Sequence, residues 1–142
     1  FIVLGIGITL GPRFGSIALI SYIFEGLIGL PVFAGTPEKG IGITYVIGPT
    51  GGYLLGYVVS AYLAGKINFN YSLPIRFFLL VVALSPVYIL GLTWLGILFG
   101  FDKPLLEWGF VPFVLAEIFK IALLAIFIPK LISYRKFISN KI

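Results

Sequence analysis

The sequence of 142 residues contains no cysteine and no histidine, and only 11% of its residues are charged. Without cysteine the chain can form neither a disulfide nor a thiolate metal site. Without histidine it lacks the commonest metal ligand and the usual general base. A soluble domain carries roughly a quarter charged residues. These shortages argue against a water-soluble fold, against metal chemistry and against a bound cofactor.

The sequence contains two long stretches without any charged residue. Residues 40–65 and 77–101 contain no Asp, Glu, Lys or Arg, and 60% of all residues are hydrophobic, with a mean hydropathy of +1.14. Each stretch is long enough to cross a bilayer as a helix, which needs about 20 residues. The sequence therefore predicts an all-α, polytopic transmembrane helical bundle. We expect residues 1–142 to form a single integral membrane domain that is surrounded by the lipid bilayer.

Glycine and proline mark where the helices should end. An apolar segment over residues 1–11 should stop at a tight turn made by Gly11-Pro12-Arg13. Further helices are expected over residues 14–29, 48–65, 75–100 and 111–134. Residues 30–45 are too rich in proline and glycine for one helix, and too apolar for a solvated loop. We expect this segment to fold back over the bundle as a lid.

Basic residues fall mainly on one side of the expected bundle. Following the helices across the membrane places seven of them together: Arg13, Lys66, Arg76, Lys130, Arg135, Lys136 and Lys141. Only Lys39 and Lys103 fall on the other side, with the acids Glu38, Asp102 and Glu107. Because basic loops stay in the cytoplasm, this split predicts a cytoplasmic C-terminus and an outward-facing lid in the plasma membrane. It also explains the net charge of +5 without a nucleic-acid partner.

Four small residues, Gly52, Gly56, Ser60 and Ala64, fall four apart in the helix expected over residues 48–65. This spacing places them along one stripe, where the backbone of another helix can come close. The stripe could serve packing within the bundle, or it could receive a helix of a partner protein. The sequence leaves both interpretations open.

Glu117 and Lys120 need an explanation, because they lie inside the last expected helix with a long apolar stretch after them. A charge near the bilayer centre costs at least ~2.5 kcal/mol. At a spacing of three residues the two side chains share one helix face. They could neutralise each other, or they could form the polar end of a ligand pocket. Both interpretations can hold when no ligand is bound.

Aromatic residues could wall a pocket for a flat ligand: Phe33, Tyr45, Tyr53, Tyr57 and Trp94. At these depths aromatic residues also form interface belts and bundle packing. Phe33, Gly35 and Tyr53 are the strongest candidates, because they flank the expected lid and the glycine-rich start of the helix over residues 48–65.

Four motifs occur in order along the chain: Gly11-Pro12-Arg13-Phe14-Gly15, Gly29-Leu30-Pro31-Val32-Phe33-Ala34-Gly35, Gly48 to Tyr57, and Pro112 to Lys120. In these motifs the sequence resembles the BioY family, the membrane-embedded biotin-binding S components of energy-coupling-factor (ECF) vitamin transporters. The resemblance covers nearly the whole chain. It implies a fold of six helices, with about four complete helices and a fragment present here, so a first helix is expected to precede Phe1.

The resemblance implies that the protein captures biotin outside the cell. It would deliver biotin inward together with a transmembrane coupling (T) component and ABC-type ATPases. The sequence contains no phosphate-binding G-x-x-x-x-G-K-[ST] motif, so we expect a transport component and not an enzyme. The rival interpretations are an S component for another small vitamin, and a membrane enzyme or structural bundle protein.

The resemblance also implies a biotin site between the lid and the last helix, with Glu117 and Lys120 at its polar end. Glu117 would accept from a ureido N–H and Lys120 would donate to the ureido carbonyl, or Lys120 would reach the biotin carboxylate instead. The family usually has Asp where Glu117 stands, so the extra methylene changes the depth of the pocket. Thr36 could replace a polar residue of the family's lid, and Tyr45 and Trp94 complete the predicted set.

Overall fold

The computed structural model describes residues 1–35, 38 and 40–139, so the predicted binding residue Thr36 lies outside the described part. Within that part the chain is helical and contains no strand. The helices are α1 (Ile2–Leu27), α2 (Ile43–Ile47), α3 (Gly51–Lys66), α4 (Leu73–Phe99), α5 (Leu105–Gly109) and α6 (Val111–Ser139). Among the described residues, three helices are long and apolar enough to cross a membrane, namely α1, α4 and α6. The predicted all-α membrane bundle is confirmed.

α1 consists of two helical segments joined at a sharp turn. The backbone of Gly11 has φ 82° and ψ 174°, which glycine adopts easily and other residues do not, and Pro12 follows it. The turn brings the two segments together, because a Cβ added at Gly15 would lie 2.9 Å from the Cα of Gly7. The turn predicted at Gly11-Pro12-Arg13 is therefore confirmed.

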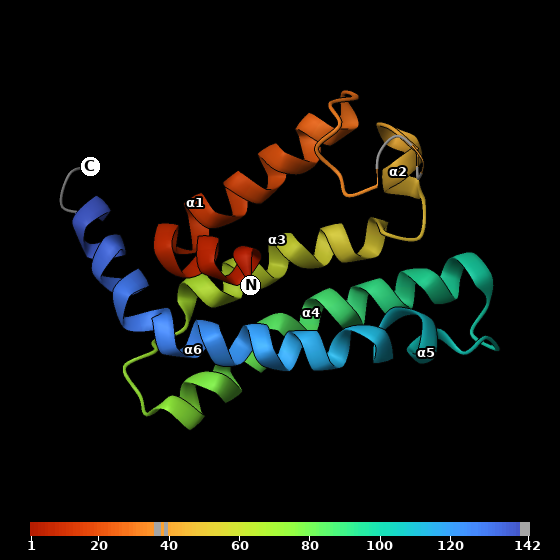
Figure 1. Ribbon diagram of the computed structural model, residues 1–142. Helices are drawn as coiled ribbons and strands as arrows, with labels where there is room; N and C mark the ends of the chain where they lie inside the picture. Colours follow the sequence, from red (N-terminus) through yellow and green to blue (C-terminus); the bar gives the residue numbers. More distant parts are fainter. Residues whose placement is uncertain (36–37, 39, 140–142) are drawn as a thin grey trace.

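α3 lies between α1 and α4 in the middle of the bundle (Figure 1). Its small residues make this position possible. A Cβ added at Gly56 would lie 2.5 Å from the Cα of Val87 in α4, and one at Gly65 would overlap the backbone of Pro12 in α1. A Cβ at Gly52 would likewise overlap α4. The small-residue stripe therefore packs within the bundle, which favours the first of the two interpretations of its spacing.

Buried side chains in the described part of the chain form two clusters. The first, the basal core, joins α1, α3, α4 and α6 and consists of Leu4, Ile8, Ala64, Phe69, Leu80, Ala83, Ile121, Leu124, Ala125 and Ile128. The second, the lid cluster, consists of Phe33, Tyr45 and Leu54, with Tyr22, Ile23, Val32, Val46 and Tyr57 packed against it. The basal core is almost entirely aliphatic, whereas the lid cluster is rich in aromatic rings and hydroxyl groups.

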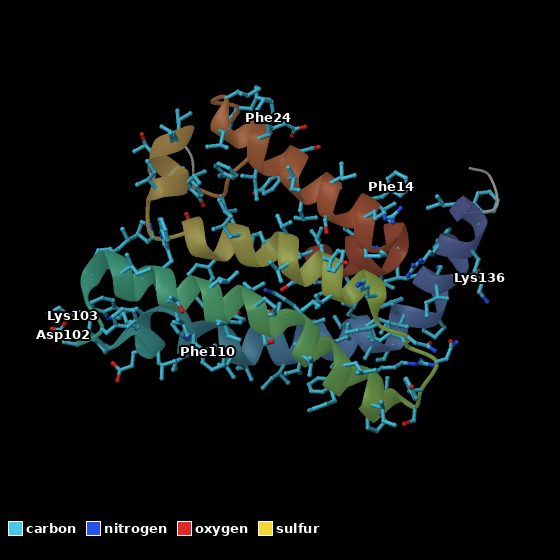
Figure 2. All side chains as sticks on the ribbon, turned by 180° about the vertical axis from the view of Figure 1, so that it is seen from behind. Phe14, Phe24, Asp102, Lys103, Phe110 and Lys136 are labelled. Atoms are coloured by element: carbon cyan, nitrogen blue, oxygen red, sulfur yellow. The ribbon has the colours of Figure 1, made fainter. Side chains whose placement is uncertain are left out.

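Charged residues lie at opposite ends of the molecule, as Figure 2 shows for Lys136 at one end and Asp102 and Lys103 at the other. At the basic end, Arg135 Nη1 donates to Gly65 O over 2.9 Å. A cation is favourable there, because the last carbonyls of a helix lack partners and carry partial negative charge. The predicted separation of charge is therefore present in the described residues. The side of the membrane on which each end lies stays a prediction.

Two short helices were not predicted. α2 lies within the segment expected to be the lid, and α5 lies in the loop before α6. Each spans five residues, which are too few for a helical pattern of apolar residues to show. α6 continues beyond its predicted end at residue 134 and bends in its later part (Figure 1). Pro129 within it is the usual cause of such a bend, because proline removes a helical hydrogen bond.

Candidate functional site

Glu117 and Lys120 pair on α6, as their spacing predicts. Lys120 Nζ donates to Glu117 Oε1 over 3.1 Å, and the Glu117 side chain is 18% exposed against 46% for Lys120. The second carboxylate oxygen, Oε2, is buried and accepts no hydrogen bond from any described residue. A buried acceptor without a donor is unfavourable. The ion pair alone therefore does not satisfy Glu117, and an acceptor stays free inside the bundle.

Phe33, the predicted lid residue, is buried at 3% exposure and stacks on Tyr45, with ring centroids 4.6 Å and planes 19° apart. Tyr22 of α1 meets Phe33 edge-on at 5.5 Å. Gly26 makes room for the phenyl ring, because a Cβ at that position would overlap it. The structure therefore brings Phe33 and Tyr45 together and adds Tyr22, which was not predicted from the sequence.

Two tyrosine hydroxyls hold the backbone of the lid. Tyr45 Oη donates to Ala34 O over 3.0 Å, and Tyr22 Oη donates to Val32 O over 3.4 Å. Gly35 follows with φ 85°, in the left-handed region that favours glycine, so the chain turns there. Gly35 is exposed at the surface of the lid. A contact between Gly35 and a ligand stays a prediction.

Tyr53 and Trp94 tie neighbouring loops to the bundle. Trp94 Nε1 donates to Gly48 O, before the start of α3, over 2.9 Å. Tyr53 Oη donates to Gly109 O, at the end of α5, also over 2.9 Å. Both side chains therefore use their polar atoms on backbone carbonyls of this chain. A ligand beside these two side chains would therefore contact the faces of their rings and not their polar atoms.

Two further tyrosines, Tyr57 of α3 and Tyr88 of α4, pack against aromatic residues named above. Tyr57 packs against the lid cluster, and Tyr88 lies edge-on to Tyr53 and to Phe110, with ring centroids 6.2 and 5.0 Å away. Figure 2 marks Phe110 where α5 leads into α6. Tyr88 was missed from the sequence, although the hydroxyl of a tyrosine within a charge-free membrane span usually finds a partner.

Fold and site together define a polytopic helical membrane protein with a buried carboxylate oxygen on α6 that has no donor and an aromatic cluster beneath a lid. No group of His, Cys, Asp and Glu that could hold a metal ion occurs in the described ranges. The sequence model of the BioY family matches residues 1–137. This chain belongs to the BioY family, as its motifs predicted.

Individual relatives agree with this assignment. The chain is 33% identical over 122 residues to the probable biotin transporter BioY of Pyrococcus horikoshii, covering 86% of this chain and 70% of the relative. It is 34% identical over 123 residues to the biotin transporter BioY of Thermotoga maritima, covering 83% of this chain and 69% of the relative. These relatives are named as transporters and not as enzymes. The prediction of a transport component rather than an enzyme therefore agrees with them.

A solved structure shows the same architecture. The fold matches the S-component for biotin from an ECF-type ABC transporter with a TM-score of 0.73 and 25% sequence identity. The match covers 91% of this chain and 70% of that one. The helical arrangement described above is therefore that of an ECF S component.

Proposed function

We propose that this chain is the biotin-binding component of an ECF-type transporter and serves the uptake of biotin. The family match over residues 1–137 and the biotin transporters among its relatives support this function. The structural observation that carries it is Glu117 Oε2, a buried acceptor without a donor on a helix long enough to cross the membrane. The ureido ring of biotin offers the donor that this atom lacks.

The ureido ring fits the Glu117–Lys120 pair better than the rest of the ligand does. Biotin has a ureido ring with N–H donors and a carbonyl at one end, and a carboxylate at the other. Side chains three residues apart on a helix have Cβ atoms about 5–6 Å apart, so both serve one end of an extended ligand. In this pose Glu117 Oε2 accepts from an N–H and Lys120 donates to the carbonyl. In the alternative pose Lys120 uses its long stem to reach the carboxylate.

The lid and the aromatic residues would enclose the rest of the ligand. We assign the remaining contacts to Phe33, Gly35, Thr36, Tyr45, Tyr53 and Trp94, with Thr36 included on sequence grounds alone. The stacked rings of Phe33 and Tyr45 support this assignment, because a flat apolar wall is already assembled beneath the lid. The hydrogen bonds from Tyr53 and Trp94 to loop carbonyls would fix the opposite wall.

Transport needs partners that supply energy. A transmembrane coupling component and ABC-type ATPases would do so, because this sequence carries no phosphate-binding G-x-x-x-x-G-K-[ST] motif of its own. In the proposed orientation the lid faces outward and the basic end, with the C-terminus, faces the cytoplasm. The seven-to-two division of basic residues supports this orientation.

The orientation can be tested with single thiols, because the chain has no cysteine. Asp102→Cys and Lys136→Cys place one thiol at each end of the molecule (Figure 2). A membrane-impermeant maleimide added to intact cells should label the cysteine at position 102 and not the one at position 136. Permeabilised cells, in which both should react, provide the control. Equal labelling of the two variants in intact cells would contradict the orientation.

Calorimetric titration of the purified protein in detergent tests the function itself. Biotin should bind saturably with one molecule per chain. Thiamine and riboflavin should give no heat of binding. If one of them binds and biotin does not, the chain is an S component for another vitamin. If none of the three binds, the proposal is wrong.

A further inference from the structure

The tyrosines around the proposed site fall into two groups. Tyr22, Tyr45 and Tyr53 each donate a hydrogen bond to a backbone carbonyl. The hydroxyls of Tyr57 and Tyr88 form no hydrogen bond within the part of the chain that the structure describes. Tyrosine hydroxyls in apolar surroundings usually find a partner. These two side chains are therefore available to a molecule that enters the bundle.

Packing between α3 and α4 places Tyr57 and Tyr88 at a similar level of the bundle. Gly56 of α3 packs on Val87 of α4, and Tyr57 and Tyr88 each follow this contact by one residue. Tyr53, one turn closer to the lid, contacts the edge of Tyr88. The tied Tyr53 therefore lies above the two free tyrosines, on the side of the lid.

Glu117 contributes a third polar group from a third helix. It lies on α6, which packs against α4, the helix that carries Tyr88. Its buried Oε2 nevertheless has no donor among the described residues, and neither hydroxyl bonds to it. α4 packs against both α3 and α6, so the Tyr57 and Tyr88 hydroxyls and Glu117 Oε2 are polar groups without partners on neighbouring helices.

We propose that Tyr57 and Tyr88 form hydrogen bonds with the ureido ring of biotin, together with Glu117. This inference rests on the proposed function and gives two aromatic residues a direct part in selecting the ligand. An ionised carboxylate can only accept, so Glu117 Oε2 takes one ureido N–H. A hydroxyl can donate and accept, so the tyrosines serve the ureido oxygen and the second N–H. A ligand without a ureido group would leave the buried Glu117 Oε2 unpaired, which is a strong basis for rejecting it.

Tyr57→Phe and Tyr88→Phe test this proposal, because each removes a hydroxyl and keeps the ring. Because each variant leaves a polar atom of the ureido ring without its partner, it should bind biotin roughly tenfold more weakly in a calorimetric titration. Biotin amide, which keeps the ureido ring and lacks the charged tail, should weaken by the same factor. With 2-thiobiotin, whose sulfur is a poor acceptor, the loss should be smaller for the variant whose hydroxyl donates to the ureido oxygen.

Tyr71→Phe is the matched control, because Tyr71 is exposed in the link between α3 and α4. It should leave the affinity for biotin unchanged. The melting temperature of each variant in detergent shows that the protein is folded, and the two positions give independent tests.

Three results would overturn the inference in distinguishable ways. If the unsubstituted protein does not bind biotin, the proposed function fails and this inference fails with it. If it binds biotin and both phenylalanine variants bind equally well, only this inference is wrong. If the variants lose affinity for biotin and not for biotin amide, the tyrosines contact the carboxylate tail and the assignment to the ureido ring is wrong.

Discussion

The basal core and the lid cluster both bury apolar side chains, but the two clusters are held together in different ways. In the basal core, aliphatic side chains such as Leu4, Leu80 and Ile128 are fully buried. Next to it, glycines let α3 approach the backbones of α1 and α4. In the lid cluster, aromatic rings stack, and hydroxyls of Tyr22 and Tyr45 hold the lid by single hydrogen bonds. The basal core is closed by aliphatic packing alone, whereas the lid cluster combines aromatic packing with a few polar contacts.

Because the two regions are held in different ways, the folding stability of the protein and its binding of a ligand should depend on different parts of the molecule. Close-packed backbones tolerate no added volume, so the end of the molecule near the basal core should move little. A single hydrogen bond between neutral groups contributes only about 0.5–1.5 kcal/mol, so the lid can open at small cost. Substitutions where α3 packs on its neighbours should therefore change folding, and substitutions near the lid should change binding.

Gly56→Leu should have the largest effect, because a Cβ at Gly56 already lies 2.5 Å from the backbone of Val87. Overpacking that side chains can absorb costs about 1–3 kcal/mol, but here a backbone is in the way, so we expect a cost above that range that prevents folding altogether. We expect loss of folded protein in detergent, measured by size-exclusion chromatography and thermal unfolding. Gly5→Leu is the matched control, because a Cβ at Gly5 meets nothing within 4 Å. An unchanged melting temperature for Gly56→Leu would show that α3 does not depend on this close approach.

Glu117→Gln should have the next largest effect, and on binding rather than folding. The substitution keeps the shape of the side chain and removes the charge that accepts from the ureido N–H. Truncating one partner of a buried charged contact costs on the order of 2–5 kcal/mol. Biotin should therefore bind at least tenfold more weakly in calorimetry, since ~1.4 kcal/mol is tenfold. Glu107→Gln, at an exposed acid on α5, serves as the control and should bind biotin normally.

Lys120→Ala distinguishes the two poses of biotin. If Lys120 serves the ureido end, the substitution should weaken biotin and biotin amide by similar factors, because both contain the same ring. If Lys120 instead contacts the tail carboxylate, biotin should lose affinity and the amide should not. Titration of both ligands against the variant and the unsubstituted protein measures the two ratios directly.

The architecture was largely predictable because membrane helices are long and uniform. The uncharged run over residues 77–101 predicted the span of α4, and the spacing of Gly52 and Gly56 predicted the packing face of α3. The pairing of Glu117 and Lys120 also follows from helical geometry alone. In each case the relevant contact is local or repeats along one helix. The uncharged run over residues 40–65 was wrongly predicted to cross the bilayer, because it is divided into α2 and the 16-residue α3, which is too short.

What sequence reasoning missed depends on contacts between distant segments. Tyr22 and Tyr88 lie in runs of other apolar residues, and nothing local shows that one holds the lid and the other packs against Tyr53 and Phe110. Tyr53 and Trp94 were predicted as walls, but the structure shows their polar atoms used on Gly109 and Gly48. The use of a polar atom depends on its neighbours in space, which the order of residues does not give.

Tyr45→Phe should have the smallest effect, and it tests the lid most directly. It removes the hydrogen bond to Ala34 O and keeps the ring that stacks on Phe33, so the lid cluster stays packed while the lid loses one tie. A neutral hydrogen bond of about 0.5–1.5 kcal/mol corresponds to a change of roughly 2- to 12-fold. Biotin should therefore dissociate severalfold faster in stopped-flow measurements, with little change in melting temperature. Tyr62→Phe, at an exposed ring of α3, should leave dissociation unchanged. Equal dissociation rates for both variants would mean that the bond from Tyr45 does not hold the lid over the ligand.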